Sequence, residues 1–139
     1  MSKVSMNTRL NASADAVWKV LREFNGLPVF IAAIKESTME GSGVGAVRTL
    51  TLEGGGPPIV EKLEALDDQA KTFSYSIVTS PLPLTNYLAK VETIDLGASQ
   101  CEVKWQSTFE PHGATEAEAV KVIEGVYSAA FEGLHKLFG

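Results

Sequence analysis

The sequence predicts an α+β domain in which a curved antiparallel sheet of about seven strands wraps around one long C-terminal helix. Three observations support this architecture: a run of strand patterns from residue 34 to residue 110, connections too short for a parallel crossover, and a final helical pattern. A sheet that curls around a single long helix buries the apolar faces of both elements. A chain of 139 residues suits one domain over 1–139 rather than two.

The first third of the chain predicts one strand and two short helices. Residues 3–10 alternate in polarity, which is typical of a half-buried strand. Residues 11–13 offer N-cap side chains to an amphipathic helical segment over 14–24, which an Asn-Gly pair ends. A proline at its start favours a second short helix over 28–33.

From residue 34 onward the chain alternates strand patterns with turn-forming residues. Clusters of Gly, Pro, Asp and Ser interrupt the apolar runs at short intervals. Thr115 and Glu118 then match a capping box, in which each side chain accepts a hydrogen bond from the other residue's backbone N–H, and predict a helix from 115 to about 138. The expected strands are residues 34–40, 45–53, 59–66, 71–79, 85–95 and 100–110.

Composition and charge argue against several function classes. Hydrophobic residues make up 45% of the chain, which is enough apolar side chain to offset the entropy of folding. The net charge is −5, whereas nucleic-acid-binding domains are typically basic. No apolar run is long enough to span a membrane, and no apolar N-terminal region resembles a secretory signal. The single cysteine, Cys101, excludes an intramolecular disulfide and is typical of a protein in the reducing cytoplasm. Taken together, these observations predict a cytoplasmic protein with no nucleic-acid partner and no membrane insertion.

Two charged residues fall on strand faces where apolar side chains are expected. Glu61 shares a face with Ile59 and Leu63, and Lys35 shares a face with Met39. Burying an unpaired charge is expensive, so an inward anion and an inward cation predict a paired polar centre in an apolar chamber. The alternatives are an ordinary buried salt bridge, or a strand edge where alternation does not mean burial. If the centre binds a ligand, a lysine suits a carboxylate or enolate.

The same alternation predicts the apolar walls of the chamber. Arg48 shares a face with the expected wall residues of its strand, but it lies near the strand's start, where a solvated position is favoured. The last strand presents one clean apolar face, most of which is expected to be core. The expected wall residues are Leu50, Leu52, Tyr75, Ile77 and Trp105.

The long helix carries small residues on one face. Gly125, Ala129 and Gly133 are spaced four residues apart and stack above one another. Glycine costs ~1 kcal/mol relative to alanine inside a helix, so two glycines there require a reason. Either another backbone packs closely against them, or they leave space for a ligand. We favour the second explanation, which adds Ala129 and Gly133 to the chamber wall.

Catalytic and metal-binding patterns are sparse. The only histidines, His112 and His135, have no matching cluster of metal ligands, and Cys101 lies mid-strand on an apolar face. We therefore expect no metal, no cofactor and no cysteine nucleophile. The one conceivable catalytic pair is Glu61 with Lys35 or Tyr87, acting as acid and base.

Several short motifs recur in the order and spacing of one known superfamily. The order of one strand, two helices, six strands and a long helix resembles the helix-grip fold of the START and pollen-allergen-like superfamily of polyketide cyclases and lipid carriers. Within it, the motifs look like those of the plant abscisic acid receptors and their bacterial relatives. The motifs are VWKVLREF over 17–24, Ile34-Lys35, Val44-Gly45, EKLEALDD over 61–68 and Leu84-Thr85-Asn86-Tyr87.

The resemblance implies a cavity between sheet and long helix, closed by two loops. The lysine matching Lys35 meets the ligand carboxylate, and the residues matching Glu61 and Tyr87 hold water around it. Both loops depart from the receptor pattern, which argues against abscisic acid itself and against phosphatase inhibition. The gate loop is Gly54-Gly55-Gly56-Pro57-Pro58 in place of Ser-Gly-Leu-Pro-Ala, and the latch loop contains Leu82-Pro83-Leu84 in place of His-Arg-Leu.

Three functional hypotheses follow. The first is a non-catalytic binding protein for a small, largely hydrophobic ligand with an acidic or carbonyl oxygen, oriented by Lys35, Glu61 and Tyr87. The second is a cyclase or dehydratase that acts on a similar ligand in the same cavity. The third is a protein whose gate and latch loops contact a protein partner or a second copy of the chain after the ligand binds.

Overall fold

The computed structural model describes residues 1–139. Strand β1 (Ser2–Leu10) is followed by helix α1 (Ala14–Leu21) and a single 3₁₀ turn, η1 (Leu27–Val29). Helix α2 (Glu116–Phe138) ends the chain. The six strands between them are β2 (Ile34–Glu40), β3 (Val47–Leu52), β4 (Ile59–Asp67), β5 (Thr72–Thr79), β6 (Leu84–Asp95) and β7 (Cys101–Pro111).

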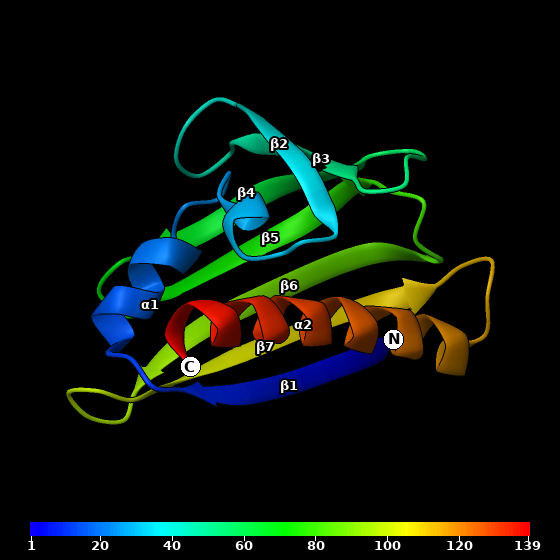
Figure 1. Cartoon of the computed structure of the whole chain (residues 1–139). Helices are drawn as coiled ribbons and strands as arrows, with labels where there is room; N and C mark the ends of the chain where they lie inside the picture. The colour runs from blue at the N-terminus through cyan, green and yellow to red at the C-terminus, as the bar shows by residue number, and fades with distance from the viewer.

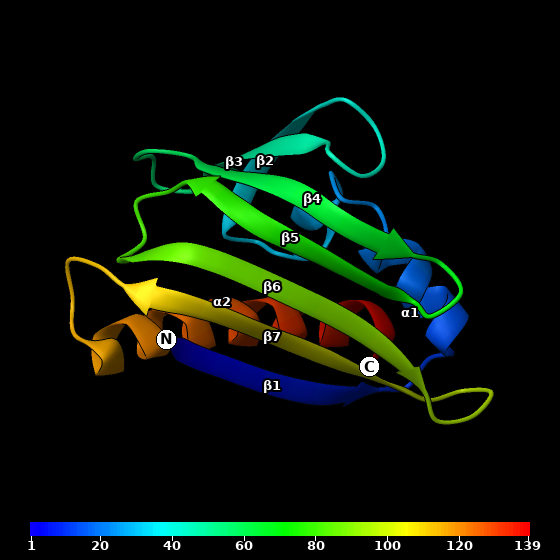
Figure 2. The same cartoon turned by 180° about the vertical axis from the view of Figure 1, so that it is seen from behind.

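The seven strands form one antiparallel sheet in the order β1-β7-β6-β5-β4-β3-β2. Helix α2 lies along the inner face of this sheet, in front of β7 and β1 in Figure 1 and behind them in Figure 2. At the other edge of the sheet, β2 and β3 curl over toward α2, and α1 and η1 lie on the same side of the sheet as α2 (Figure 1). The predicted helix-grip α+β fold is confirmed.

Helix α2 begins as its sequence predicts. The Thr115 hydroxyl accepts a hydrogen bond from the Glu118 N–H at 3.2 Å, and the Glu118 carboxylate accepts one from the Thr115 N–H at 3.2 Å. The helix buries one stripe against the sheet, including Ile123, Tyr127 and Leu134. At 23 residues it is ~35 Å long, which is enough to cross a small domain.

The two short helical segments are shorter than predicted. Helix α1 ends at Leu21, before Phe24, and the Phe24 carbonyl accepts a hydrogen bond from Arg48 Nη1 at 2.6 Å. The predicted helix over 28–33 is wrong, since only the turn η1 forms there. Beyond it the chain passes so close to α2 that the Phe30 carbonyl lies against Gly133.

The sheet opens between β5 and β6. Their ladder runs from Thr72 opposite Glu92 to Ser76 opposite Leu88 and then stops, although β5 continues to Thr79. The first residues of β6 pair only with β7 on the other side. The two strands therefore diverge toward the loop that joins them (Figure 2).

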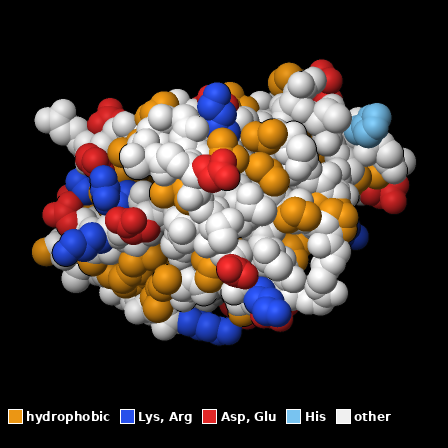
Figure 3. Space-filling model, turned by 90° about the horizontal axis from the view of Figure 1, so that it is seen from above, with side chains coloured by type: hydrophobic (Ala, Val, Ile, Leu, Met, Phe, Trp, Pro, Cys, Tyr) orange, Lys and Arg blue, Asp and Glu red, His pale blue; other side chains and the backbone are white.

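Surface charge, helix hydropathy and side-chain clusters concern three kinds of partner: nucleic acids, membranes and metal ions. On the face seen from above, Lys and Arg side chains are interspersed with Asp and Glu rather than gathered into one basic patch (Figure 3). None of the helices combines the length and the hydropathy that a membrane span requires. No group of three or more His, Cys, Asp or Glu side chains comes together in a way that could hold a metal ion.

Candidate ligand-binding site

A cavity of about 230 Å³ lies between α2 and the inner face of the sheet. Of its 18 lining residues 16 are hydrophobic, and the two exceptions are Arg48 and Glu61. The aromatic side chains of Tyr75, Tyr87 and Trp105 form one part of the wall. The aliphatic part consists of Leu27, Ile31, Ala33, Ile34, Leu50, Leu52, Ile59, Ile77, Leu82, Ile123, Val126, Ala129 and Ala130.

Arg48 and Glu61 form a buried ion pair in this wall. They lie directly opposite each other on β3 and β4, and their residues are 1% and 6% exposed. The Arg48 Nε and Nη2 atoms contact the same carboxylate oxygen, Oε1, at 2.8 and 2.6 Å. The favoured prediction of a solvated Arg48 is wrong, because its strand turns the side chain inward and pairs it across the ladder.

The side chains around the ion pair contact the guanidinium of Arg48 on its faces, whereas only one carboxylate oxygen of Glu61 accepts a hydrogen bond. The guanidinium carbon lies 3.8 Å from the centroid of the Phe24 ring and 5.1 Å from that of Tyr75, within the range of cation–π attraction. The hydrogen bond from Arg48 goes to Oε1, and the second carboxylate oxygen of Glu61, Oε2, accepts no hydrogen bond from the protein. Burial raises the pKa of Glu61, and Arg48 opposes this rise.

A chain of hydrogen bonds links four aromatic side chains. Trp105 Nε1 donates to the Tyr75 hydroxyl at 3.0 Å. The Tyr75 and Tyr87 hydroxyls are 3.2 Å apart, and those of Tyr87 and Tyr127 are 2.6 Å apart. Burial raises the pKa of Tyr75 and Tyr87 well above its ordinary value and that of Tyr127 to about 12. All three hydroxyls are therefore protonated at neutral pH.

The number of protons in this chain exceeds the number of tyrosine–tyrosine links. The Trp105 indole can only donate, so it supplies a proton to Tyr75 and takes none. Three tyrosine hydroxyls carry three protons, but only two links join them. Whichever tyrosine donates in each of the two hydrogen bonds, one hydroxyl proton is therefore not used in a tyrosine–tyrosine hydrogen bond. In two of the three possible arrangements this proton is on Tyr75 or Tyr87, which line the cavity, and a bound hydrogen-bond acceptor can take it there. In the third arrangement it is on Tyr127, which does not line the cavity.

A family model described as polyketide cyclase / dehydrase and lipid transport matches residues 1–139, the whole chain. The chain belongs to this family.

Solved structures of related proteins match over nearly the full length. Protein XoxI from Bacillus cereus is 29% identical, with 99% of this chain and 96% of that chain covered and a TM-score of 0.92. Two more distant structures share the fold. ZhuI aromatase/cyclase from Streptomyces sp. R1128 is 18% identical, with 97% and 92% covered and a TM-score of 0.80. Norcoclaurine synthase from Thalictrum flavum, in complex with dopamine and hydroxybenzaldehyde, is 21% identical, with 98% and 85% covered and a TM-score of 0.74.

In this family member, most of the residues expected at the ligand lie on the cavity wall. Two of the three expected polar residues, Glu61 and Tyr87, are there. The wall also includes Leu50, Leu52, Tyr75, Ile77, Trp105 and Ala129.

Lys35 lies outside the cavity, contrary to expectation. Its side chain is exposed, and it is not among the lining residues. The register of β2 against β3 shifts between Ile34 and Glu36, so the alternation on which the expectation rested is broken at this residue. Ile34 lines the cavity, and Arg48 supplies the buried cation that pairs with Glu61.

The small residues of α2 divide between the two explanations considered for them. A Cβ atom at Gly133 would lie 1.6 Å from the Phe30 carbonyl oxygen, so this glycine permits close backbone packing and does not line the cavity. Gly125 is exposed, and a Cβ atom at this position would have no neighbouring atom within 4 Å. Only Ala129 faces the cavity.

The two loops expected to close the cavity differ in their contacts. The gate loop over 54–58 is exposed, and none of its residues lines the cavity. In the latch loop, Leu82 lines the cavity and Leu84 is buried. The carbonyl of half-buried Pro83 accepts a hydrogen bond from the His112 N–H at 3.0 Å, which ties the latch to the end of β7.

Sequence reasoning missed several wall residues. Ile123, Val126 and Ala130 are spaced as neighbours on one helix face, so helical periodicity was a usable indication of their place. Leu27 and Ile31 flank an irregular turn, where no periodic pattern indicates which side chain points inward.

Proposed function

We propose that this protein binds a small, largely hydrophobic ligand with an acidic or carbonyl oxygen in the cavity between the sheet and α2, as a carrier or a sensor. The observation that carries this proposal is the cavity itself, whose wall is apolar except for one buried ion pair and one set of tyrosine hydroxyls. Small-molecule sites combine apolar walls with a few converging polar groups in this way.

The polar groups favour a carbonyl over a carboxylate. Glu61 already neutralises the charge of Arg48, so an incoming anion would meet a pair with no net charge. The spare tyrosine proton suits a neutral acceptor, and Tyr87 is the cavity-facing hydroxyl with two tyrosine neighbours. In this proposal Tyr87 donates to the ligand oxygen, and Glu61 Oε2 accepts from a hydroxyl or an enol on the ligand.

A second candidate is a reaction of the cyclase or dehydratase type on a similar ligand. The observation that favours it is a buried carboxyl group with a raised pKa and one oxygen that accepts no hydrogen bond from the protein. Such a group can exchange a proton with a bound substrate. In this alternative Glu61 moves the proton, and the tyrosine hydroxyls stabilise the developing oxyanion.

The gate and latch loops are also a candidate contact surface. The resemblance to abscisic acid receptors assigns these loops to contact with a protein partner or with a second copy of the chain. The exposure of the whole gate loop is compatible with that assignment. Light scattering of the protein with and without ligand tests the contact with a second copy, because a ligand-dependent change in mass is expected if two copies associate through these loops.

Native mass spectrometry tests the main proposal. The purified protein is measured intact, and bound material is then extracted under denaturing conditions. We expect a small molecule at near-stoichiometric level, recovered unchanged after renewed incubation with fresh protein. Chemical conversion during that incubation would favour the enzyme. An empty protein that shows no thermal shift with lipophilic acids and ketones would contradict ligand binding.

A further inference from the structure

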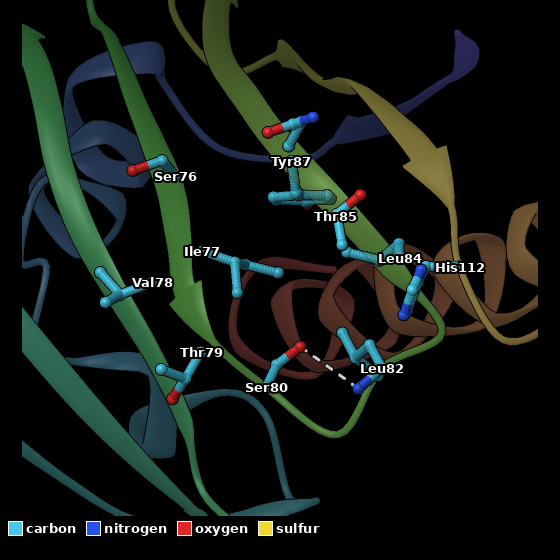
Figure 4. A pocket seen from close by; sticks show the side chains of 11 residues that line it. Ser76, Ile77, Val78, Thr79, Ser80, Leu82, Leu84, Thr85, Tyr87 and His112 are labelled. Carbon is cyan, nitrogen blue, oxygen red and sulfur yellow. Dashed lines mark hydrogen bonds between the residues drawn. The ribbon is translucent and has the colours of Figure 1, made fainter.

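A second space lies where β5 and β6 diverge. It is a groove of about 570 Å³ lined by the end of β5, the latch loop, the start of β6 and His112 (Figure 4). Figure 4 looks into this opening, with Ile77 on β5 and Leu82 on the latch loop lying between the two strands, and α2 behind them.

The groove adjoins the inner cavity. Ile77, Leu82 and Tyr87 line both spaces, so the same three side chains form the boundary between them. Leu82 belongs to a loop and is only half-buried, which makes it the boundary residue with the most freedom to move. A displacement of the Leu82 side chain would connect the two spaces.

The size of the cavity also points to a site that continues outward. Ligand pockets usually enclose roughly 300–1,000 Å³. The inner cavity, at about 230 Å³, lies below this range, whereas the cavity and groove taken together lie within it.

The opening is held by specific contacts of the chain. Asn86 adopts a left-handed conformation with φ of 54°, and the register of β6 against β7 shifts at this point. Its side chain donates to Glu110 on β7 at 3.1 Å. Pro81 and Pro83, in the loop beyond the unpaired stretch, lack N–H groups and cannot donate to a ladder. The start of β6 is thus bound to β7, and the gap to β5 stays open.

The chemistry of the groove differs from that of the cavity. It contains no Lys, Arg, Asp or Glu among its lining residues. Its polar side chains carry hydroxyl, amide or imidazole groups, which can form hydrogen bonds with neutral hydroxyls. These polar residues are Ser76, Thr79, Ser80, Thr85, Asn86 and His112. Of these, Ser76 and Asn86 already donate to the carboxylates of Glu64 and Glu110.

We propose that cavity and groove form one elongated site for an amphiphile whose apolar end lies in the cavity and whose neutral, hydroxyl-rich head lies in the groove. This inference rests on the proposed function, because it requires the cavity to bind an apolar group. Beyond the proposed function, this inference names the opening through which the ligand extends, between β5 and β6, and the chemical class of the ligand's polar head.

Isothermal titration with three probes of one chain length tests the proposal. The probes are 1-hexanol, hexyl β-D-glucopyranoside and hexanoate, each below its micellar concentration. We expect the glucoside to bind at least tenfold more tightly than hexanol, and hexanoate to bind more weakly than the glucoside. The Thr85→Trp variant, which fills the groove, should remove the advantage of the glucoside and leave hexanol binding within twofold. Thr51→Trp, at an exposed position on β3 outside the groove, should change neither.

Each other outcome has a distinct meaning. Equal affinity for glucoside and hexanol, or glucoside binding that Thr85→Trp leaves unchanged, would overturn the groove assignment while hexanol binding still supports the cavity. Hexanoate binding more tightly than the glucoside would overturn the neutral head. If no probe binds the wild-type protein, the proposed function fails and this inference fails with it. Unchanged hexanol binding by Thr85→Trp also shows that the variant is folded.

Discussion

At the scale of single residues, the Arg48–Glu61 pair contributes to both stability and the site. Removing one member of a buried ion pair leaves the other charge unpaired, which usually costs about 3–5 kcal/mol. We expect Arg48→Met to lower the free energy of unfolding by that amount in urea titrations. The double variant Arg48→Met/Glu61→Leu should recover most of the loss, because neither charge remains. A double variant as unstable as the single one would contradict this account of the pair.

Glu61 also predicts how stability depends on pH. Its pKa is raised in the folded state, chiefly by burial, so the folded protein binds this proton more tightly than the unfolded chain does. Its contribution is therefore fully present below the ordinary value of 4.5 and is lost as pH rises through the folded-state value. The unfolding free energy of the wild type minus that of Glu61→Gln should fall as pH rises from 4 toward neutrality. A difference that grows with pH would mean that Arg48 dominates and lowers this pKa.

Single residues also mark the limit of sequence-based prediction. Strand alternation put Glu61 and Tyr87 on the apolar faces of their strands, and both line the cavity, although a register shift lies beside each of them. It failed at Lys35, where a register shift breaks the alternation. It also put Arg48 on the inward face, and the error there was to expect a solvated position at the start of the strand. Neither the register shift nor the burial of a strand's start can be derived from the order of polar and apolar residues.

At the scale of elements, helix α2 offers a matched pair of glycines. We expect Gly133→Ala to destabilise the protein by about 3 kcal/mol, the upper end of the usual range for overpacking, because its Cβ would overlap the Phe30 carbonyl. Gly125→Ala should instead stabilise it by up to ~1 kcal/mol, because alanine is the better helix former and the site is open. Thermal unfolding of both variants measures this. Equal effects of the two substitutions would exclude the close packing at Gly133.

The elements themselves were largely predictable. The capping box at Thr115 places the start of α2, and turn residues place the strand ends to within about two residues. The divergence of β5 and β6 was not predictable, because it depends on a left-handed Asn86 and on contacts to β7 that the sequence pattern does not encode. The groove that follows from this divergence was therefore missed.

At the scale of the whole molecule, the curvature of the sheet and the position of α2 decide how much space remains inside. Large side chains such as Trp105 and Tyr127 occupy part of the interior, with ring centroids 5.6 Å apart. The small side chain of Ala129 lies at the remaining space. Whether a family member keeps a cavity depends on this balance of side-chain volumes across distant elements, which neither composition nor periodicity determines.

The most direct test of the central claim is calorimetric titration of acetophenone, a small aromatic ketone, into the wild type and into Ala129→Phe. We predict saturable 1:1 binding by the wild type and at least a tenfold loss in Ala129→Phe, whose larger side chain fills the cavity. Lys35→Ala, a change outside the cavity, should leave the affinity unchanged. Equal binding by wild type and Ala129→Phe, or no binding by the wild type, would contradict the claim that this cavity is the binding site.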